Sequence, residues 1–273
     1  MEPRTILITG ASSGIGKDAA IRLAELGHTV YTAARRIEKM KDLREIGCHP
    51  LKVDITNEDE VDSAFQTIQE NHGGIDILVN NAGYGLYGAM EDIPIEDARY
   101  QFDVNLFGLA HLTQLVLPHM REQGFGRIIN MSSMGGKVYT PLGSWYHATK
   151  HALEGWTDCL RLEVEPFGIH VSLIEPGAID TEFGDVMTDP ILKYSGETAY
   201  GDFTKNYVEV VEKNYRPGSG SPPSVITDLI VKAIKAKRPR TRYVAGKYAR
   251  PMMFIRKWLG DRIYDRIVMA MVR

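Results

Sequence analysis

Short hydrophobic runs alternate with longer segments of helical periodicity along most of the chain. The runs are rich in β-branched residues and continuous rather than alternating in polarity, which is typical of strands buried on both faces of a parallel sheet. They predict seven strands, at residues 6–9, 29–33, 50–53, 75–79, 127–131, 170–174 and 241–244. The longer segments predict helices at residues 14–26, 57–70, 94–120, 144–165 and 222–236.

This repeated alternation predicts an α/β fold with a single Rossmann-type, doubly wound parallel sheet flanked by helices. Right-handed crossovers then bring the carboxyl ends of the strands to one edge, where ligands bind. No internal repeat, low-complexity tract or long linker divides the chain, so we expect one domain over residues 1–273. Its expected parts are a cofactor-binding and catalytic core at 4–182, a helical substrate lid at 183–224 and an amphipathic extension at 249–273.

The composition is that of a soluble globular protein, with 44% hydrophobic residues, 25% charged residues and a formal net charge of -3. No apolar run approaches the roughly 20 residues needed to cross a bilayer, and the start of the chain does not resemble a signal peptide. Cys48 and Cys159 form neither a metal-like cluster nor a disulfide framework, and the histidines lack metal-ligand spacing. We therefore expect a cytoplasmic protein without a metal ion or a nucleic-acid partner.

A glycine-rich turn separates the first predicted strand from the first predicted helix. Glycine at such a turn lets the backbone bend tightly and lets a pyrophosphate approach the helix N-terminus, where N–H groups favour negative charge. The spacing G-x-x-x-G-x-G differs from the commonest dinucleotide fingerprint, G-x-G-x-x-G, although it occupies the same place between strand and helix. We expect the cofactor to contact Gly10, Ser12, Ser13, Gly14, Ile15 and Gly16.

Two arginines, Arg35 and Arg36, follow the second predicted strand. NAD-selective sites usually place an acidic residue there to hold the ribose 2′-hydroxyl. A guanidinium pairs instead with a 2′-phosphate, which a carboxylate would repel. We therefore predict NADP(H) as the cofactor, with Ser13 as a further hydroxyl donor. The alternative is a solvated basic loop in which Glu38 holds the ribose.

Tyr146 and Lys150 are four residues apart on a predicted helix, so their side chains share one face. A phenol exchanges protons poorly at neutral pH, but a nearby ammonium and an oxidised nicotinamide both favour the phenolate. Tyr146 is therefore a candidate general acid for ketone reduction and general base for alcohol oxidation. Ser133, which follows the strand at 127–131, is the candidate hydroxyl that holds the substrate oxygen.

Together these motifs resemble the short-chain dehydrogenase/reductase family. The family is marked by a TGxxxGxG turn, an NNAG segment, a catalytic Asn–Ser–Tyr–Lys set and a PG segment followed by a threonine. The chain carries all of them in order over residues 4–182: the turn at 9–16, the NNAG segment at 80–83, and Asn105, Ser133, Tyr146, Lys150, Pro176, Gly177 and Thr181. The fold of this family is the doubly wound sheet that the periodicity predicts, and its NADP(H)-using members share the Ala34–Arg35 pair.

The resemblance implies a role for each matching residue. Ser133 and Tyr146 bind the substrate oxygen, and Tyr146 exchanges the proton. Lys150 binds the nicotinamide ribose and tunes Tyr146, while Asn105 supports a water-linked proton path to Lys150. The other implied cofactor contacts are Asp54 at the adenine, Asn81, Ala82 and Gly83 along the cleft, Pro176 and Gly177 in the PG segment, and Ile179 and Thr181 against the nicotinamide.

Aromatic and aliphatic residues beyond Thr181 predict an apolar substrate site. A helical stripe, which in this family lies in the region that covers the substrate, consists of Ala199, Phe203, Tyr207, Val211 and Tyr215. Further residues that could line the mouth are Tyr84, Leu86, Tyr87, Val138 and Tyr139. We expect a hydrophobic alcohol or carbonyl substrate that is lipid-like, retinoid-like, steroid-like or aromatic. The stripe could also simply pack on the domain.

The C-terminal region is basic and amphipathic. Residues 232–273 contain 13 Lys and Arg against 2 Asp and Glu, a balance of +11 in a chain of net charge -3. One predicted helical stripe consists of Met252, Ile255, Leu259, Ile263 and Ile267. Such a helix can make peripheral contact with a membrane, cover its own active site or pack on a second subunit. Because members of the family are commonly dimers or tetramers, we expect a homo-oligomer.

Two neighbours of the candidate catalytic residues are expected to be structural. His147 lies on another helical face from Tyr146, and Ser132 points to the opposite side of the strand end from Ser133. An NADP(H)-binding sensor without turnover is the alternative function, which the complete Ser–Tyr–Lys set disfavours. An epimerase or dehydratase of the same fold would carry a longer C-terminal domain and a differently spaced glycine turn.

Overall fold

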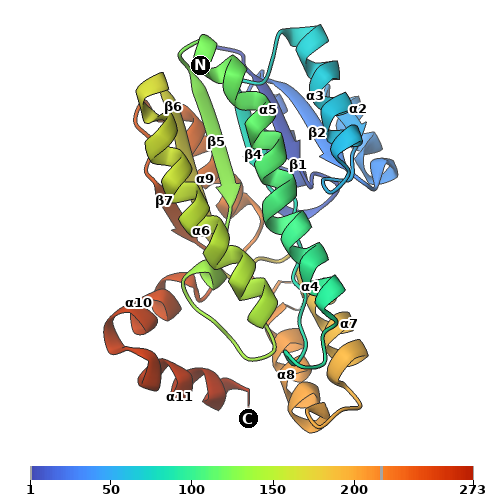
Figure 1. Cartoon of the computed structure of the whole chain (residues 1–273), viewed down its shortest axis with the longest axis vertical. Helices are drawn as coiled ribbons and strands as arrows, with labels where there is room; N and C mark the ends of the chain where they lie inside the picture. The colour runs from blue at the N-terminus through green and yellow to red at the C-terminus, as the bar shows by residue number, and fades with distance from the viewer. Residues whose placement is uncertain (1, 216–217, 273) are drawn as a thin grey trace.

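A parallel β-sheet forms the centre of the protein (Figure 1). The computed structural model describes residues 2–215 and 218–272, without the side chains of residues 185, 186, 214 and 215. Within these residues the strands are β1 (Thr5–Thr9), β2 (Thr29–Ala34), β3 (His49–Lys52), β4 (Ile77–Asn80), β5 (Gly126–Met131), β6 (Ile169–Pro176) and β7 (Arg242–Ala245). Neighbouring strands are parallel in the order β3-β2-β1-β4-β5-β6-β7. The predicted strands and the doubly wound topology are confirmed, and the strand order reverses between β1 and β4, where such sheets bind ligands.

Helices cover both faces of the sheet (Figure 1). One face carries α1 (Gly14–Glu25), α2 (Lys41–Glu45) and α9 (Ser224–Lys235), and the other carries α3 (Glu58–His72), α5 (Gly108–Glu122) and α6 (Ser144–Val164). Short 3-10 turns are η1 (Ile37–Met40), η3 (Met134–Gly136) and η4 (Glu165–Phe167). The predicted helical segments therefore form, because their apolar stripes face the sheet.

Local chemistry sets the ends of α3. The Asn57 side chain accepts the backbone N–H of Glu60 at 3.2 Å, which satisfies a donor that the helix itself leaves unpaired. Acidic residues occupy the first turn, where their negative charge interacts favourably with the positive end of the helix dipole. Gly73, at φ +76°, ends the helix in a left-handed conformation that glycine adopts without strain.

The segment predicted as one helix at 94–120 contains a π-helical turn. α4 (Ile95–Phe102) passes into the turn η2 (Asp103–Phe107), and α5 continues from Gly108. A Cβ atom on Gly108 would come 2.3 Å from the carbonyl oxygen of Ile55, so the helix approaches its neighbour as closely as glycine allows. A π turn inserts one residue into the helical repeat and often marks a functional site. This one carries Asn105, whose side chain is fully buried.

A pair of helices lies beyond the carboxyl edge of the sheet (Figure 1). α7 (Phe183–Ser195) and α8 (Gly201–Tyr215) pack on each other through a shared hydrophobic cluster. α8 contains most of the stripe predicted for the lid, although the side chain of Tyr215 lies outside the described residues. The periodicity does not predict α7, which contains Pro190 in its interior.

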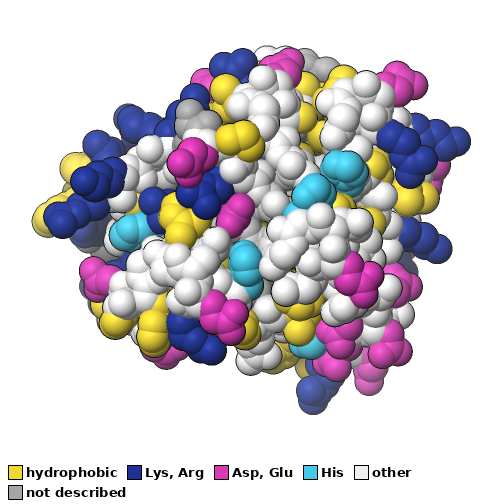
Figure 2. Space-filling view, turned by 90° about the horizontal axis from the view of Figure 1, so that it is seen from above, with side chains coloured by type: hydrophobic (Ala, Val, Ile, Leu, Met, Phe, Trp, Pro, Cys, Tyr) yellow, Lys and Arg dark blue, Asp and Glu magenta, His cyan; other side chains and the backbone are white. Residues whose placement is uncertain are grey.

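The C-terminal extension forms two helices rather than one. α10 (Ala249–Leu259) and α11 (Asp261–Met271) meet at Gly260, whose φ of +75° lies outside the helical range. They project from one side of the molecule in Figure 1, and Figure 2 shows basic and hydrophobic side chains together at that side. The prediction of one continuous helical stripe is wrong, because the helix is interrupted at Gly260 and the stripe residues differ in burial: Met252 and Ile255 of α10 pack inward, whereas Leu259 at the end of α10 and Ile263 of α11 are exposed. No helix in the described part of the chain is long and apolar enough to cross a membrane.

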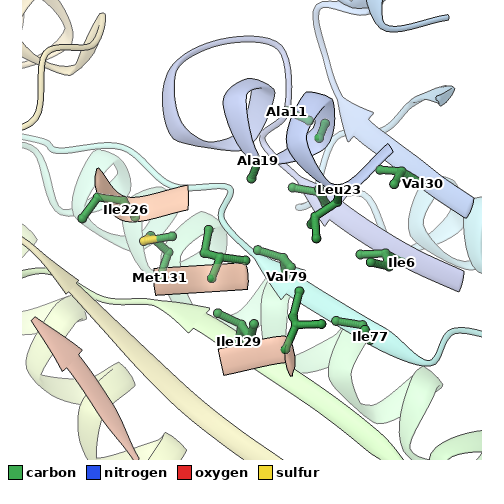
Figure 3. Close-up of a cluster of buried hydrophobic side chains, with 14 of the residues drawn as sticks. Ile6, Ala11, Ala19, Leu23, Val30, Ile77, Val79, Ile129, Met131 and Ile226 are labelled. Carbon is green, nitrogen blue, oxygen red and sulfur yellow. The ribbon is translucent and has the colours of Figure 1, made fainter. Parts of the chain in front are cut away.

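One hydrophobic cluster fastens α1 and α9 to the sheet (Figure 3). The strand residues Ile6, Val79 and Ile129 are buried, and Leu23 of α1 and Ile226 of α9 lie against them. Burial of each such side chain stabilises the fold by about 1.5–3 kcal/mol. Because α1 begins directly after the glycine turn, this packing also holds the turn at the edge of the sheet.

Candidate active site

A cavity of about 530 Å³ opens at the carboxyl edge of the sheet. Residues that follow β1, β2, β3, β4, β5 and β6 line it, together with side chains of α7, α8, α10 and α11. All the predicted cofactor contacts line this cavity except Gly16. Of the predicted catalytic residues, Ser133, Tyr146 and Lys150 line it, and Asn105 lies outside the lining. The structure thus brings together residues from widely separated parts of the chain.

The glycine turn is packed too tightly for larger residues. The Asn81 side-chain amide donates to the carbonyl oxygens of Thr9 and Gly10 at 3.0 and 3.1 Å. A Cβ atom on Gly16 would lie 2.5 Å from the same Asn81 nitrogen, and one on Gly10 would lie 2.8 Å from the Cα of Ala82. Gly16 is therefore needed for packing of the turn, whereas Gly10 and Asn81 also reach the cavity wall.

The N-terminus of α1 faces the cavity. Ser13 precedes the helix with an extended backbone, and its side chain does not cap the helix. Gly14 and Ile15, the first two helical residues, line the cavity. The first N–H groups of a helix have no partner within it, so this end presents donors and a positive dipole to an anionic ligand.

Arg36 lies at the centre of a polar network beside this helix end. Its guanidinium donates to the hydroxyls of Ser12 and Ser13, each at 3.1 Å, and to the Glu182 carboxylate at 3.0 Å. Lys39 donates to the other oxygen of Glu182 at 2.9 Å. The hydrogen bond from Lys39, followed by those from Arg36, lowers the pKa of Glu182 to about 2. Sequence reasoning missed Glu182, because its partner Arg36 lies far away along the chain.

Arg35 and Asp54 occupy neighbouring parts of the same wall. The Arg35 guanidinium donates to the Tyr100 hydroxyl at 3.1 Å and is turned away from the Arg36 network. One oxygen of Asp54 accepts the backbone N–H and the hydroxyl of Thr56 at 3.0 and 2.8 Å. Both residues line the cavity, whereas Glu38 is exposed and does not. The part of the cavity wall that follows β2 is therefore cationic, because Arg35 and Arg36 line it.

Lys150 is buried beside the end of β5. Its ammonium donates to the carbonyl oxygen of Met131 at 2.8 Å, and burial lowers the pKa of Lys150 to about 8. Asn105 lies behind the wall, where its amide donates to the Tyr84 carbonyl at 2.9 Å and to the Thr149 hydroxyl at 3.1 Å. Asn105 therefore fixes the backbone after β4 against the helix that carries Lys150.

Tyr146 and Ser133 face the cavity from α6 and from the end of β5. The Tyr146 ring is 6% exposed and packs against Tyr87 and Phe183, with ring centroids 5.4 and 5.7 Å apart. The Lys150 ammonium lies 6.0 Å from the centroid of the Tyr146 ring. The Ser133 hydroxyl accepts the N–H of Gly135 at 3.0 Å. The cavity wall thus holds a phenol, a hydroxyl and an ammonium close together.

The segment after β6 closes the opposite wall. Gly177 donates its N–H to the carbonyl of Ala245 at 2.8 Å, and a Cβ atom on Gly177 would come 2.1 Å from the Lys247 carbonyl. Pro176, Gly177, Ile179 and Thr181 line the cavity. The predicted PG segment therefore lies against the cavity because its glycine permits close packing on the chain after β7.

The short chain dehydrogenase family model matches residues 4–190. The chain belongs to the short-chain dehydrogenase family. The match includes the glycine turn, the NNAG segment and the residues Ser133, Tyr146 and Lys150. The resemblance carried by these motifs is therefore confirmed, and the chain is a member of a family of oxidoreductases.

Named relatives align with this short-chain dehydrogenase over almost its whole length. A 3-ketodihydrosphingosine reductase of Bacteroides thetaiotaomicron is 38% identical over 265 residues, which cover 96% of this chain and 96% of the relative. An NADPH-dependent 3-dehydrocapnine reductase of Ornithobacterium rhinotracheale is 32% identical, with 97% and 95% covered. The solved structure of a short-chain dehydrogenase from Streptomyces avermitilis has a TM-score of 0.81 at 30% identity and covers 98% of this chain and 99% of that chain.

A histidine anchors the loop beside the serine of this short-chain dehydrogenase. The Nδ1–H of His147 donates to the Gly135 carbonyl at 3.0 Å, and its Nε2 accepts the N–H of Thr140 at 3.0 Å. Burial lowers the pKa of His147 to about 4, so the ring is neutral at physiological pH. The Tyr207 hydroxyl donates to the Thr140 hydroxyl at 3.0 Å and joins α8 to the same loop. The expected structural role of His147 agrees with this geometry.

The end of the cavity under α7 and α8 is largely apolar. Of the residues predicted for the mouth and the lid, those that line the cavity are Tyr84, Tyr87, Val138, Tyr207 and Val211. The structure adds side chains of α7 that sequence reasoning did not single out, Phe183 and Met187. A hydrophobic ligand would therefore exchange water for apolar contacts on several sides.

Some residues predicted for this end of the cavity lie elsewhere. Leu86 packs under the loop with Ile93 and Ala98, because the chain turns away after the NNAG segment. Tyr139 packs against Tyr264 of α11, with ring centroids 5.0 Å apart. The prediction that Leu86 and Tyr139 line the mouth is wrong. Among the stripe residues, Phe203 packs in the hydrophobic cluster shared by α7 and α8, and Ala199 precedes α8 and is exposed.

The C-terminal helices cover one side of the cavity. The hydroxyl of Tyr264 donates to the Tyr139 carbonyl at 2.9 Å, and Val272 packs into the cluster formed by α7 and α8. Five residues of the extension line the cavity: Met252, Tyr264, Val268, Met271 and Val272. Of the three arrangements open to the basic helix, contact with the candidate active site of its own chain is therefore present in the structure.

Proposed function

We propose that this protein is an NADP(H)-dependent short-chain dehydrogenase that interconverts a hydrophobic alcohol and its ketone or aldehyde. The observation that carries the proposal is the meeting of Ser133, Tyr146 and Lys150 in one cavity. The same cavity extends from the N-terminus of α1 to an apolar chamber under α7, α8 and α11. This arrangement suits a reaction between a bound dinucleotide and a carbonyl group.

The residues at the turn fit a dinucleotide that carries a 2′-phosphate. The helix end at Gly14 and Ile15 would hold the pyrophosphate, and the tight glycine turn leaves room for it. Arg36 with Ser12 and Ser13 forms a cationic, hydroxyl-rich corner that would hold the 2′-phosphate. The NADPH-dependence in the name of the relative from Ornithobacterium supports this choice over NAD(H).

Tyr146 would move the proton while the bound nicotinamide supplies or accepts the hydride. Ser133 and Tyr146 would hold the substrate oxygen, and Tyr146 would donate its phenolic proton to that oxygen during reduction. The positive charge of Lys150, within 6.0 Å of the phenol ring centroid, favours the phenolate left behind. Asn105 holds the cavity wall in position through its hydrogen bonds. It would also support a water-linked proton path to Lys150.

A ketone on a long alkyl chain is the substrate that we favour. The apolar chamber is lined by aromatic and aliphatic side chains such as Tyr87, Phe183 and Tyr207. Two relatives of nearly the same length are named as reductases of 3-ketodihydrosphingosine and 3-dehydrocapnine. These names support the lipid-like choice over the retinoid-like, steroid-like and aromatic ones, and the reducing direction over the oxidising one.

The test follows NADPH absorbance with purified protein and a panel of ketones that includes 3-ketodihydrosphingosine, a steroid ketone and an aromatic ketone. We expect turnover with NADPH, and a loss of about 10²–10⁴-fold in Tyr146→Phe with NADPH binding retained. Preference for NADH would contradict the role proposed for Arg36. NADPH binding without turnover on any carbonyl would favour the sensor alternative.

A cytoplasmic location, a single domain and assembly into a dimer or tetramer stay predictions.

A further inference from the structure

The exposed side of α10 and α11 carries large hydrophobic side chains. Phe254 is 60% exposed, Trp258 65%, Leu259 47% and Ile263 43%. Phe254 and Trp258 are one helical turn apart, and their ring centroids lie 6.4 Å apart, so they form one continuous patch. Since the opposite side of these helices already packs on the cavity, closing the active site does not account for this patch.

Positive charge surrounds the hydrophobic patch. The acids of the two helices are engaged by protein groups: Asp261 pairs with Arg256, and Asp265 accepts the Tyr139 hydroxyl at 2.8 Å. The exposed cations are Arg250 and Lys257 on α10 and Arg262 and Arg266 on α11. On the side where these helices lie, Figure 2 shows basic and hydrophobic side chains together. The surface is therefore amphipathic with a basic border.

We propose that α10 and α11 dock the protein on an anionic lipid surface. Phe254 and Trp258 would enter the headgroup region, and the surrounding Arg and Lys side chains would contact lipid phosphates. A basic helix with a strong apolar side lies in the plane of a membrane interface, and tryptophan is enriched at that depth. Each cation close to an anionic bilayer strengthens binding by about 5-fold.

A second copy of the chain fits this surface less well. An isologous contact pairs the same patch on both subunits. It would bring the exposed cations of one copy, such as Lys257 and Arg262, towards those of the other, and like charges repel. An anionic bilayer is complementary to both the apolar centre and the basic border of the patch.

The docking surface adjoins the apolar end of the cavity. The same two helices place Met252, Tyr264, Val268 and Met271 in its lining. A membrane against their outer side would therefore lie next to the chamber in which we place the ketone. Entry of a long-chain ketone from the bilayer rests on the proposed function, whereas docking itself does not.

Sedimentation with vesicles tests the docking surface. The full-length protein is mixed with phosphatidylcholine vesicles or with vesicles that also contain about 30% phosphatidylglycerol. We expect it to sediment with the anionic vesicles and to stay in solution with the neutral ones. Lys257→Gln/Arg262→Gln should lower the affinity for anionic vesicles by about 30-fold. Phe254→Ala/Trp258→Ala should lower it by about 10-fold or more.

Matched controls remove the same groups elsewhere. Leu162→Ala removes a side chain that is 62% exposed on α6, and Lys232→Gln/Lys235→Gln removes two exposed charges on α9, so both should bind as the wild type does. The proposal is wrong if the wild type does not sediment with anionic vesicles, or if both pairs of tail substitutions leave its affinity unchanged. A changed oligomeric state in the tail variants, without vesicle binding by the wild type, would identify a subunit interface instead.

Turnover of a water-soluble ketone without vesicles separates this proposal from the proposed function. The tail variants should retain wild-type turnover there, since Phe254, Lys257, Trp258 and Arg262 do not line the cavity. Absence of turnover by all these proteins on every ketone of the panel as well would overturn the proposed function and leave the vesicle result standing.

Discussion

Replacing Glu182 with glutamine is expected to strengthen the binding of NADPH. The Glu182 carboxylate accepts hydrogen bonds from Arg36 at 3.0 Å and from Lys39 at 2.9 Å, where we place the 2′-phosphate. Because these cations lower its pKa to about 2, Glu182 is negatively charged at any pH used for an assay. The cofactor phosphate must therefore share its cations with a carboxylate, and glutamine removes that competing charge.

The expected gain follows from the distance between the two anions. Anions that share one guanidinium lie about 5 Å apart, where water-like screening leaves a repulsion of about 1 kcal/mol. The side chains of Arg36 and Glu182 are each 44% exposed, so the stronger coupling of a protein interior does not apply. Loss of 1 kcal/mol of repulsion corresponds to about 5-fold tighter binding. Each of the two lost surface ion pairs, with Arg36 and with Lys39, costs only about 0–1 kcal/mol of stability, so the variant should fold.

Fluorescence titration with NADPH and NADH measures the effect. The ratio of the dissociation constants for NADH and NADPH should rise by about 5-fold in Glu182→Gln, because only NADPH carries the 2′-phosphate. Glu45→Gln removes an exposed carboxylate from α2 and should leave the ratio unchanged. Arg36→Gln should lower the ratio by about 10-fold or more. An unchanged ratio in Glu182→Gln, or equal tightening for both cofactors, would refute the placement of the phosphate.

Three further substitutions test the packing and the buried charges around the site. Gly16→Ala puts a Cβ atom 2.5 Å from the Asn81 amide, so the free energy of unfolding in urea should fall by about 1–3 kcal/mol; wild-type stability would contradict the tight turn. Burial, followed by Glu154, raises the pKa of Glu175 to about 7. The folded state then holds a proton that the unfolded state releases, so this contribution to stability is complete below about pH 4.5 and is lost as the pH rises through about 7. Urea unfolding of Glu175→Gln should lack that decline, and its persistence would show that other groups cause it. His147→Leu should cost about 1–3 kcal/mol of unfolding free energy and keep the shape of the pH–rate profile; an altered profile would indicate a proton-transfer role.

The sequence determined the sheet and much of the cavity wall. Continuous apolar runs predict buried parallel strands, because a strand covered on both faces leaves no polar side for solvent. The spacing of Tyr146 and Lys150 predicts that both side chains lie on one face of their helix, because residues four apart on a helix are neighbours. Motif order then places Ser133 and the glycine turn at the same edge, because the strands are parallel and their carboxyl ends meet there.

The sequence alone did not predict the contacts between segments that lie far apart along the chain. The ion pair of Arg36 with Glu182 joins the end of β2 to the start of α7, and no local pattern predicts which carboxylate meets which guanidinium. The π turn that carries Asn105 adds one residue to a helix, which hydrophobic periodicity does not resolve. Tyr139 was predicted for the mouth, yet it packs on α11, because the position of α11 depends on the whole domain.

In the C-terminal extension, local sequence and tertiary structure determine different properties. Its local sequence alone determines a basic amphipathic surface, because the charges and the apolar residues recur at helical spacing. Only the tertiary structure decides which residues face the cavity, since Gly260 turns the chain between α10 and α11. Tyr264 and Val268 then pack inward, while Phe254 and Trp258 are left exposed. Local sequence sets the helices and their charges, whereas their orientation follows from the packing of the complete chain.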